Sequence, residues 1–244
     1  MAYVQFLIAG VQKCGTSALD AYLRQHPEIE MAAPKETHFF DRESGVNWRS
    51  PDYDLLHGHY RHDERLHGEA TPVTLYWTPA HYRVLTYNPD MKFILLFRDP
   101  AERAWSHWKM IRSRGQDSLP FSRAVREGRM RALDQDGPMG LSRLHSYVER
   151  GFYARQIEEL SKLFAHRQML FLDQGELDTR PDNALAKVTD FLGVSRMAPV
   201  TPERVNVSAA DHEEAFSTED RLYLKELYRT DQDRFERMTG LRLG

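Results

Sequence analysis

Short runs of apolar residues recur along the chain, separated by segments in which apolar positions return every three or four residues. The apolar runs predict buried strands at Phe6–Ala9, Phe93–Phe97 and Met169–Leu172. The segments with helical spacing predict helices at Ser17–Gln25, Ala101–Arg112, Tyr147–Phe164, Pro181–Leu192 and Thr218–Met238. Strands that alternate with helices are typical of an α/β fold, in which a central parallel β-sheet is flanked by helices in three layers.

Residues at the helix ends fit this assignment. Asp99-Pro100 has the form of an N-cap followed by a first-turn proline, and Gly193 has the form of a C-terminal glycine. Residues 112–145 contain several glycines and arginines and predict a partly helical excursion from the sheet, near an acceptor site. A solvated charged face is the alternative interpretation of this stretch. The length of 244 residues suits a single domain over 1–244.

The composition excludes some classes of partner. Charged residues make up 28% of the chain and the net charge is -3, so there is no overall attraction to nucleic acid or to a membrane surface. Cys14 is the only cysteine, which excludes an internal disulfide and favours a reducing compartment. The apolar run before Gly10 is too short for a signal segment or a membrane span. We therefore expect a cytoplasmic protein; the oligomeric state is not indicated.

The first apolar run leads into the loop Gly10-Val-Gln-Lys-Cys-Gly-Thr-Ser and then into a predicted helix. Small residues let such a loop curl until several N–H groups point inward, and the positive end of the helix faces the same point. The loop therefore predicts a phosphate site in a P-loop-like fold. In the nucleotide triphosphate version, lysine and then Ser/Thr directly follow the second glycine, and the hydroxyl holds Mg²⁺. Here Thr16 takes the place of that lysine and the loop lysine is Lys13, so we expect a phosphate donor that needs no metal.

A second candidate site lies at the end of the Phe93–Phe97 run. Arg98 follows this strand at the sheet edge where α/β proteins bind ligands. Ser106 lies about two turns into the next helix, and the two side chains together would hold a further phosphate. The alternative is an arginine paired with Asp99 or Glu102.

Taken together, these segments resemble the sulfotransferases that use 3'-phosphoadenosine-5'-phosphosulfate (PAPS), most closely the heparan sulfate branch and its bacterial relatives. The resemblance is carried by the loop at Gly10, by Lys35-Glu-Thr-His-Phe-Phe-Asp, by Glu69-Ala-Thr-Pro and by Arg98-Asp-Pro-Ala-Glu-Arg. It extends more weakly through Gly151-Phe-Tyr and Phe191-Leu-Gly, and so spans most of the chain.

The resemblance implies an enzyme that moves a sulfuryl group from PAPS to an acceptor and releases 3'-phosphoadenosine-5'-phosphate (PAP). Lys13 would steady the leaving phosphate, and Arg98 and Ser106 would bind the 3'-phosphate. The donor loop would comprise Gln12, Lys13, Cys14, Gly15, Thr16 and Ser17. Sulfuryl transfer also needs a base for the proton of the acceptor, and the resemblance assigns this role to Glu36.

Other observations leave the base open. His38 competes with Glu36, and both would border one site if Pro34–Phe40 is extended. Aromatic neighbours would raise the pKa of Glu36 and make it a better base near neutrality. The structural alternative is an ion pair of Glu36 with Lys35 or Arg42.

The acceptor is not specified. The resemblance implies a hydroxyl, or less readily an amine, of a small molecule, a lipid or a carbohydrate. Ala70 stands where heparan-type members carry a lysine at the reacting centre, which weakens the case for a glycosaminoglycan. Asn206-Val207-Ser208 falls where those members bind the adenosine, and His57, His59, His62 and His67 match no familiar metal spacing.

Two other functions share parts of this pattern. A P-loop kinase or nucleotidase would use Mg-ATP, which has no 3'-phosphate for Arg98 and Ser106 to hold. A catalytically inactive scaffold would keep nucleotide affinity alone.

Overall fold

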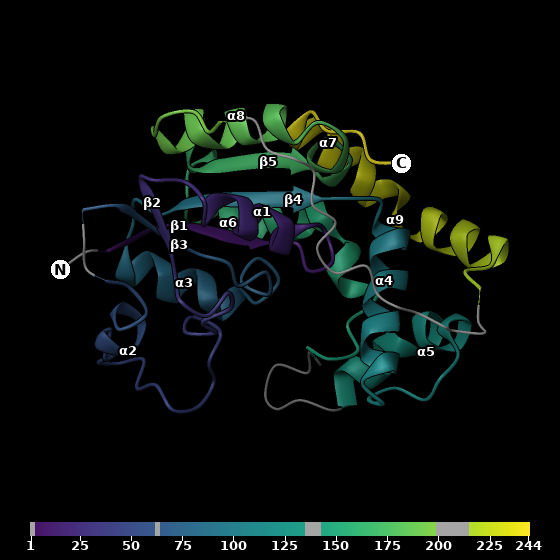
Figure 1. Cartoon of the computed structure of the whole chain (residues 1–244). Helices are drawn as coiled ribbons and strands as arrows, with labels where there is room; N and C mark the ends of the chain where they lie inside the picture. The colour runs from purple at the N-terminus through teal and green to yellow at the C-terminus, as the bar shows by residue number, and fades with distance from the viewer. Residues whose placement is uncertain (1–2, 62–63, 135–142, 199–214) are drawn as a thin grey trace. The chain divides into compact units, whose positions relative to one another are not determined.

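The computed structural model describes residues 3–61, 64–134, 143–198 and 215–244 (Figure 1). The chain divides into two compact units. Unit 1 comprises Met1–Phe97 and Gln156–Val205, and unit 2 comprises Arg98–Arg155 and Asn206–Gly244. That residues 1–244 act as one domain stays a prediction.

A parallel five-stranded sheet forms the centre of unit 1. The strand order is β2-β3-β1-β4-β5, with β1 at Val4–Gly10, β2 at Ile29–Met31, β3 at Leu66–Glu69, β4 at Lys92–Phe97 and β5 at Met169–Asp173. Phe93–Phe97 are fully buried because helices cover both faces of the central strands, which is why such strands read as continuous apolar runs. The three strands predicted from apolar runs are therefore confirmed as β1, β4 and β5.

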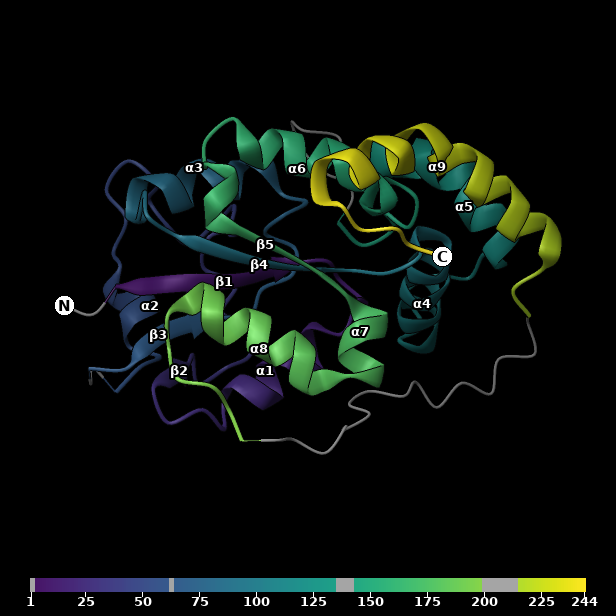
Figure 2. The ribbon, with the colours of Figure 1, turned by 90° about the horizontal axis from the view of Figure 1, so that it is seen from above.

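Helices cover both faces of this sheet. The helix α1, Thr16–Leu23, lies on the same face as α8, Pro181–Leu192, and α3, Thr78–Tyr87, lies on the other (Figures 1 and 2). Unit 1 also contains two short helices, α2 at Asp54–His57 and α7 at Gln174–Thr179, and a 3₁₀ turn at His166–Gln168. The predicted α/β fold, with a central parallel sheet between helical layers, is confirmed.

β2 and β3 have no long apolar run, and β3 packs closely against β1 through Gly68. In β3, a Cβ added at Gly68 would lie only 2.0 Å from Cζ of Phe6 on β1, so only glycine lets the Phe6 ring pack there. β3 pairs with β1 on one side and with β2 on the other, and the register places Met31 beside Gly68.

Unit 2 is helical in the part of the chain that the structure describes. It contains α4 at Pro100–Ser113, α5 at Phe121–Asp134, a 3₁₀ turn at Glu149–Gly151 and α9 at Thr218–Thr239. A buried cluster that includes Trp108, Phe121 and Tyr228 joins these helices. The side chain of Asp99 caps α4 by accepting a hydrogen bond from the Glu102 N–H at 2.8 Å, and Pro100 is the first helical residue, as predicted.

The predicted helix Tyr147–Phe164 is wrong in its first part. The chain instead forms the 3₁₀ turn at Glu149–Gly151, and the helix α6 spans only Tyr153–Ser161. A Cβ at Gly151 would lie 2.5 Å from Cζ of the buried Tyr228, so the backbone passes tightly against α9. Phe152 then leaves the helical region, with φ -80° and ψ 80°.

The predicted excursion at 112–145 is partly helical in its described portion, because it contains α5; residues 135–142 lie outside the described part.

Candidate functional site

The loop Gln12–Ser17 connects the carboxyl end of β1 to the start of α1. Lys13 has φ 73° and Gly15 has φ 86°, so two residues of this short loop adopt the left-handed conformation. The Cys14 N–H donates to the Val11 carbonyl at 3.1 Å and closes the turn. Alternation of left- and right-handed residues makes backbone N–H groups converge, as in the concave sites that bind anions.

The N-terminus of α1 opens into the same loop. Gly15 is its N-cap, and no side chain makes a capping hydrogen bond there. The N–H groups of a first helical turn have no partner within the helix, and the helix dipole favours an anion beside them. A Cβ at Gly15 would lie 3.2 Å from Cγ of Gln174 on α7, in addition to the unfavourable φ. This position therefore requires glycine, and the loop fits a phosphate group.

The side chains of the loop divide between core and surface. Cys14 is fully buried and Thr16 is 4% exposed, whereas Gln12, Lys13 and Ser17 are half-buried. The Cys14 Sγ lies 4.0 Å from the Gln12 carbonyl oxygen, so this small side chain fills the turn. Lys13 and Ser17 therefore remain accessible to a ligand.

Glu36, His38 and Asp41 form one charged cluster. The His38 Nε2 lies 3.3 Å from Oε2 of Glu36, and the His38 Nδ1 lies 3.1 Å from Oδ2 of Asp41. Lys35 Nζ donates to Oε1 of Glu36 at 3.0 Å. The segment is not regularly extended as assumed, since His38 has φ 50°, yet Glu36 and His38 do meet. The expected ion pair of Glu36 with Lys35 is also present.

The pKa of Glu36 is lowered in this cluster, whereas the sequence predicts that it is raised. Partial burial raises the pKa of Glu36, but the hydrogen bond from His38 and the charge of Lys35 outweigh it and lower this pKa to about 2. Hydrogen bonds to Asp41 and Glu36 raise the pKa of His38 to about 10, against the effect of burial. The predicted upward shift for Glu36 is therefore wrong, because its close neighbours are cations rather than aromatic rings.

The buried carboxylate of Glu69 holds the segment that carries this cluster. Glu69 is 1% exposed, and its Oε2 accepts hydrogen bonds from the hydroxyls of Thr37 at 2.8 Å and Thr71 at 2.7 Å. The Ala70 N–H donates to the Lys35 carbonyl at 3.2 Å. Glu69-Ala-Thr-Pro thus holds the segment that carries Glu36 and His38.

The Glu36 end of the charged cluster acts electrostatically on α1, the helix that follows the loop. Burial raises the pKa of Asp20 on α1, while Arg24 and Lys35 lower it and the charge of Glu36 raises it further. The side chain of Arg24 also donates to the Ala32 carbonyl at 2.8 Å, just before the segment. The sequence-predicted residues Lys13, Glu36 and His38 therefore all belong to unit 1. Lys13 lies just before α1, and the charge of Glu36, which pairs with His38, acts on Asp20 of α1.

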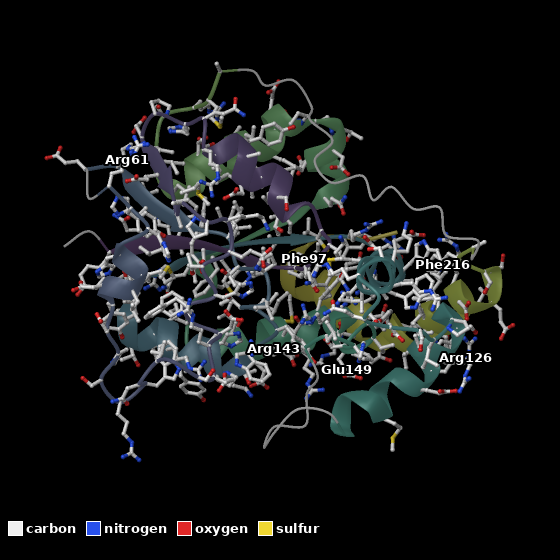
Figure 3. All side chains as sticks on the ribbon, turned by 60° about the horizontal axis from the view of Figure 1, so that its bottom comes forward. Arg61, Phe97, Arg126, Arg143, Glu149 and Phe216 are labelled. Carbon is white, nitrogen blue, oxygen red and sulfur yellow. The ribbon has the colours of Figure 1, made fainter. Side chains whose placement is uncertain are left out.

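Arg98 and Ser106 belong to unit 2. Arg98 directly follows Phe97, the last residue of β4 (labelled in Figure 3), and its side chain is 27% exposed. Its Nη2 lies 3.9 Å from Oε2 of Glu102, a long ion pair, and Glu102 also pairs with Arg221 on α9. Ser106 lies in α4 and is half-buried. The expected pairing of Arg98 with Glu102 is thus present, and phosphate binding by Arg98 and Ser106 stays a prediction.

Sequence reasoning missed two supporting residues. Asp41 ends the Lys35-Glu-Thr-His-Phe-Phe-Asp motif without an assigned role, yet it contacts His38 directly. Arg83 on α3 was not singled out, although it binds the segment that follows His38. A signal for Asp41 exists, since it stands three residues after His38, but nothing local indicates Arg83.

The remaining features are the segment at residues 206–208 and the questions of a metal site and a membrane span. Asn206, Val207 and Ser208 lie outside the described residues. Within the described ranges, no three His, Cys, Asp or Glu side chains are grouped so that they would hold a metal ion, and no helix is long and apolar enough to span a membrane. The cytoplasmic location stays a prediction.

Comparison with known proteins gives consistent results. A family model described as the sulfotransferase domain matches residues 4–231. Human heparan sulfate glucosamine 3-O-sulfotransferase 3B1 is 33% identical over 195 residues, which are 79% of this chain and 47% of that protein. Human bifunctional heparan sulfate N-deacetylase/N-sulfotransferase 3 is 30% identical over 211 residues, 78% of this chain and 22% of that protein.

Among solved structures, a sulfotransferase from Alicyclobacillus acidocaldarius superposes with a TM-score of 0.81 at 26% identity. The match covers 100% of this chain and 98% of that one. By contrast, the matched part of this chain covers 47% of the length of 3-O-sulfotransferase 3B1 and 22% of the length of the N-deacetylase/N-sulfotransferase.

Proposed function

This chain belongs to the sulfotransferase family, and we propose that it transfers a sulfuryl group from PAPS to a hydroxyl group of a carbohydrate acceptor. The family resemblance drawn from the sequence is thereby confirmed, as is the assignment to a class of PAPS-dependent enzymes. The observation that carries the finer proposal is the Glu36–His38–Asp41 cluster, whose Glu36 is close enough to α1, the helix that follows the loop, for its charge to act on Asp20.

The donor loop fits the phosphosulfate. Left-handed residues at Lys13 and Gly15 turn the backbone around a concave point, and the uncapped start of α1 faces it. PAPS supplies an activated sulfuryl group and a phosphate leaving group. Lys13 would neutralise the charge that develops on the leaving phosphate, while the backbone N–H of the buried Thr16 and the side chain of Ser17 would contact its oxygens. Arg98 and Ser106 are proposed to bind the 3'-phosphate.

The charged cluster favours Glu36 over His38 as the base. With a pKa of about 10, His38 is protonated near neutral pH and has no lone pair with which to accept a proton. Glu36 is ionised and 38% exposed, so its carboxylate is available to an acceptor hydroxyl. His38 would orient this carboxylate, and Asp41 would in turn orient His38.

A hydroxyl acceptor is preferred over an amine. The 3-O-sulfotransferase relative is named for a hydroxyl acceptor and the N-sulfotransferase relative for an amine; the first is the more similar, at 33% against 30% identity. Both are named for heparan sulfate, which favours a carbohydrate over a small molecule or a lipid. Ala70, at the place of the heparan-type lysine, is fully buried and supplies no cation, so the particular carbohydrate need not be heparan sulfate.

The test measures donor binding first and transfer second. Thermal unfolding would be followed with PAP, with ADP and with Mg-ATP, for the wild type and for Lys13→Ala and Arg98→Ala. A ligand at about a hundred times its dissociation constant should add roughly 2.7 kcal/mol of stability. We expect stabilisation by PAP, reduced in both variants, and a preference for PAP over ADP that is lost in Arg98→Ala.

Transfer would then be measured with radiolabelled PAPS and three acceptors: a heparan sulfate oligosaccharide, a simple phenol and a long-chain alcohol. Label on the oligosaccharide alone, abolished in Glu36→Gln, would support the proposal. Stabilisation by Mg-ATP but not by PAP would overturn the donor assignment, and label on the phenol alone would overturn the carbohydrate acceptor.

A further inference from the structure

The segment that carries His38 and Asp41 has little regular structure of its own. Within residues 32–53 the structure shows neither helix nor strand. Its hydrophobic side is anchored, because Phe39 and Phe40 are buried and their rings meet edge to face. His38 faces outward and is 52% exposed, so packing does not fix it. Burial of the two rings leaves the His38 side chain and the backbone that follows Phe40 to be fixed by hydrogen bonds.

Arg83, on α3, supplies these bonds. Its Nη1 donates to the Phe40 carbonyl and to the Arg42 carbonyl, each at 2.9 Å. These are the residues immediately before and after Asp41. The guanidinium also forms a two-pronged ion pair with Glu43, with Nη1 and Nη2 each 3.0 Å from a carboxylate oxygen. One side chain thus bonds to three of the four consecutive residues of the turn.

The surroundings keep Arg83 in place. Its guanidinium lies over the Trp48 ring at 4.4 Å, and the side chain is only 12% exposed. Trp48 Nε1 donates to the same Arg42 carbonyl at 2.9 Å. On the other side, Trp77 Nε1 donates to Oε1 of Glu43 at 2.6 Å. A planar fork that makes several directed bonds and stacks on an aromatic ring is a role that lysine cannot fill.

The turn held by Arg83 leads directly to His38. Arg42 Nε donates back to the His38 carbonyl at 3.1 Å, and Asp41 contacts the His38 ring. His38 has φ 50°, an unfavourable conformation for a residue other than glycine, so it depends on these bonds.

We propose that Arg83 is a positioning residue for the reaction: it fixes the Phe40–Glu43 turn so that His38 stays between Asp41 and Glu36. This inference rests on the proposed function for its catalytic meaning, but its structural part can be tested without any acceptor or donor.

The first measurement is the titration of His38 by NMR. The charged groups that act on His38 are Asp41 and Glu36, and Lys35 acts on Glu36. The His38 signal among the eleven histidines would be identified by its loss in His38→Gln. In Arg83→Lys and Arg83→Gln we expect the His38 pKa to fall toward its ordinary value of 6.5, because the ring leaves its two carboxylates. The control is Arg123→Lys, an exposed arginine that pairs with Glu127 on α5.

The second measurement separates positioning from general damage. A displaced base that leaves the donor loop intact should lower kcat by about 10- to 100-fold, while the KM for PAPS and the stabilisation by PAP remain those of the wild type. If Arg83→Gln fails to fold, Trp48→Phe serves instead, because it removes one hydrogen bond to the Arg42 carbonyl and keeps an aromatic ring.

The outcomes are distinguishable. An unchanged His38 pKa in the folded Arg83 variants, or in Trp48→Phe if they do not fold, would overturn the positioning role, even if the variants are less stable. An unchanged kcat despite a lowered pKa would also overturn it. If PAP fails to stabilise the wild type, the proposed function is wrong, and the titration still decides whether Arg83 holds His38.

Discussion

Replacing the buried Glu69 should separate the value of its hydrogen bonds from the cost of its charge. Its Oε2 accepts both the Thr37 and the Thr71 hydroxyl, and the side chain is 1% exposed. In Glu69→Ala both hydroxyls lose their acceptor, at about 1–3 kcal/mol each. We expect a loss of about 4 kcal/mol and a fall in Tm of roughly 8–16 °C.

Glu69→Gln should behave differently. The amide oxygen can accept both hydroxyl bonds, and no charge is buried. Burial raises the pKa of Glu69, against the hydrogen bonds from Thr71 and Thr37. Because the folded-state pKa is raised, the contribution of Glu69 to stability is fully present below its ordinary value of 4.5 and is lost as the pH rises through the raised value. The Thr37 backbone N–H also donates to the carboxylate, and an amide has one acceptor oxygen where the carboxylate has two. Glu69→Gln should therefore be more stable than Glu69→Ala, and the wild type should lose stability relative to it as the pH rises.

The assay is urea and thermal unfolding, followed by circular dichroism, at about pH 5 and about pH 8. The wild type should lose stability between the two pH values relative to Glu69→Gln. Glu219→Ala, which removes a glutamate side chain that is 86% exposed, is the control and should change stability by no more than about 0.5 kcal/mol. If Glu69→Gln is as unstable as Glu69→Ala at the higher pH, the ionised carboxylate itself is needed and the reasoning fails.

Two further predictions concern a close contact and an ion pair. In Gly151→Ala, the added Cβ would meet the buried Tyr228 ring at 2.5 Å, so calorimetry should show a loss of about 1–3 kcal/mol; an unchanged Tm would mean that the turn yields freely. The raised pKa of His38 implies stability that is fully present below pH 6.5 and is lost as the pH rises through about 10. His38 is 52% exposed, so solvent screening limits this contribution to about 0.2–1 kcal/mol. Urea unfolding of the wild type and of His38→Gln should therefore converge at high pH, and a constant difference between them would contradict the ion pair.

The strands and helices that the sequence predicts well are those with strong local patterns. β4 reads as an uninterrupted apolar run because both of its faces are buried, and α8 coincides with the predicted Pro181–Leu192, between a first-turn proline and a left-handed glycine. The sequence does not predict β2 and β3, because they are only three and four residues long and β3 includes Gly68 and Glu69, which are poor strand formers. Their place in the sheet depends on pairing with β1 and with each other.

In the candidate site too, the sequence predicts the parts that are contiguous in the chain and not those that depend on distant residues. The phosphate loop is contiguous in the chain, so its glycine, its lysine and the following helix could be interpreted together. Glu36 and His38 contact the nearby Lys35 and Asp41, but the bonds that hold their segment in place come from residues more than thirty positions away, such as Glu69 to Thr37 and Arg83 to Phe40. Glu69 stands in the Glu69-Ala-Thr-Pro motif, but nothing in that motif indicates which residues it bonds, and Arg83 has no neighbouring pattern that distinguishes it from an ordinary arginine. Only the folded chain reveals these contacts.

The pKa of Glu36 is lowered rather than raised, and this bears on the proposed mechanism. The sequence places aromatic residues next to Glu36, but Phe39 and Phe40 turn into the core, and Lys35 and His38 contact the carboxylate instead. A carboxylate with a pKa of about 2 is a weak base toward a free hydroxyl. If sulfuryl transfer passes through a loose transition state, as phosphoryl transfer does in most analyses, the hydroxyl becomes strongly acidic only as its bond to sulfur forms. A weak base suffices when the proton leaves this late, provided that it is held within hydrogen-bonding distance. The cluster therefore favours precise placement of Glu36 over basicity, which is consistent with a site whose supporting residues serve mainly to fix its geometry.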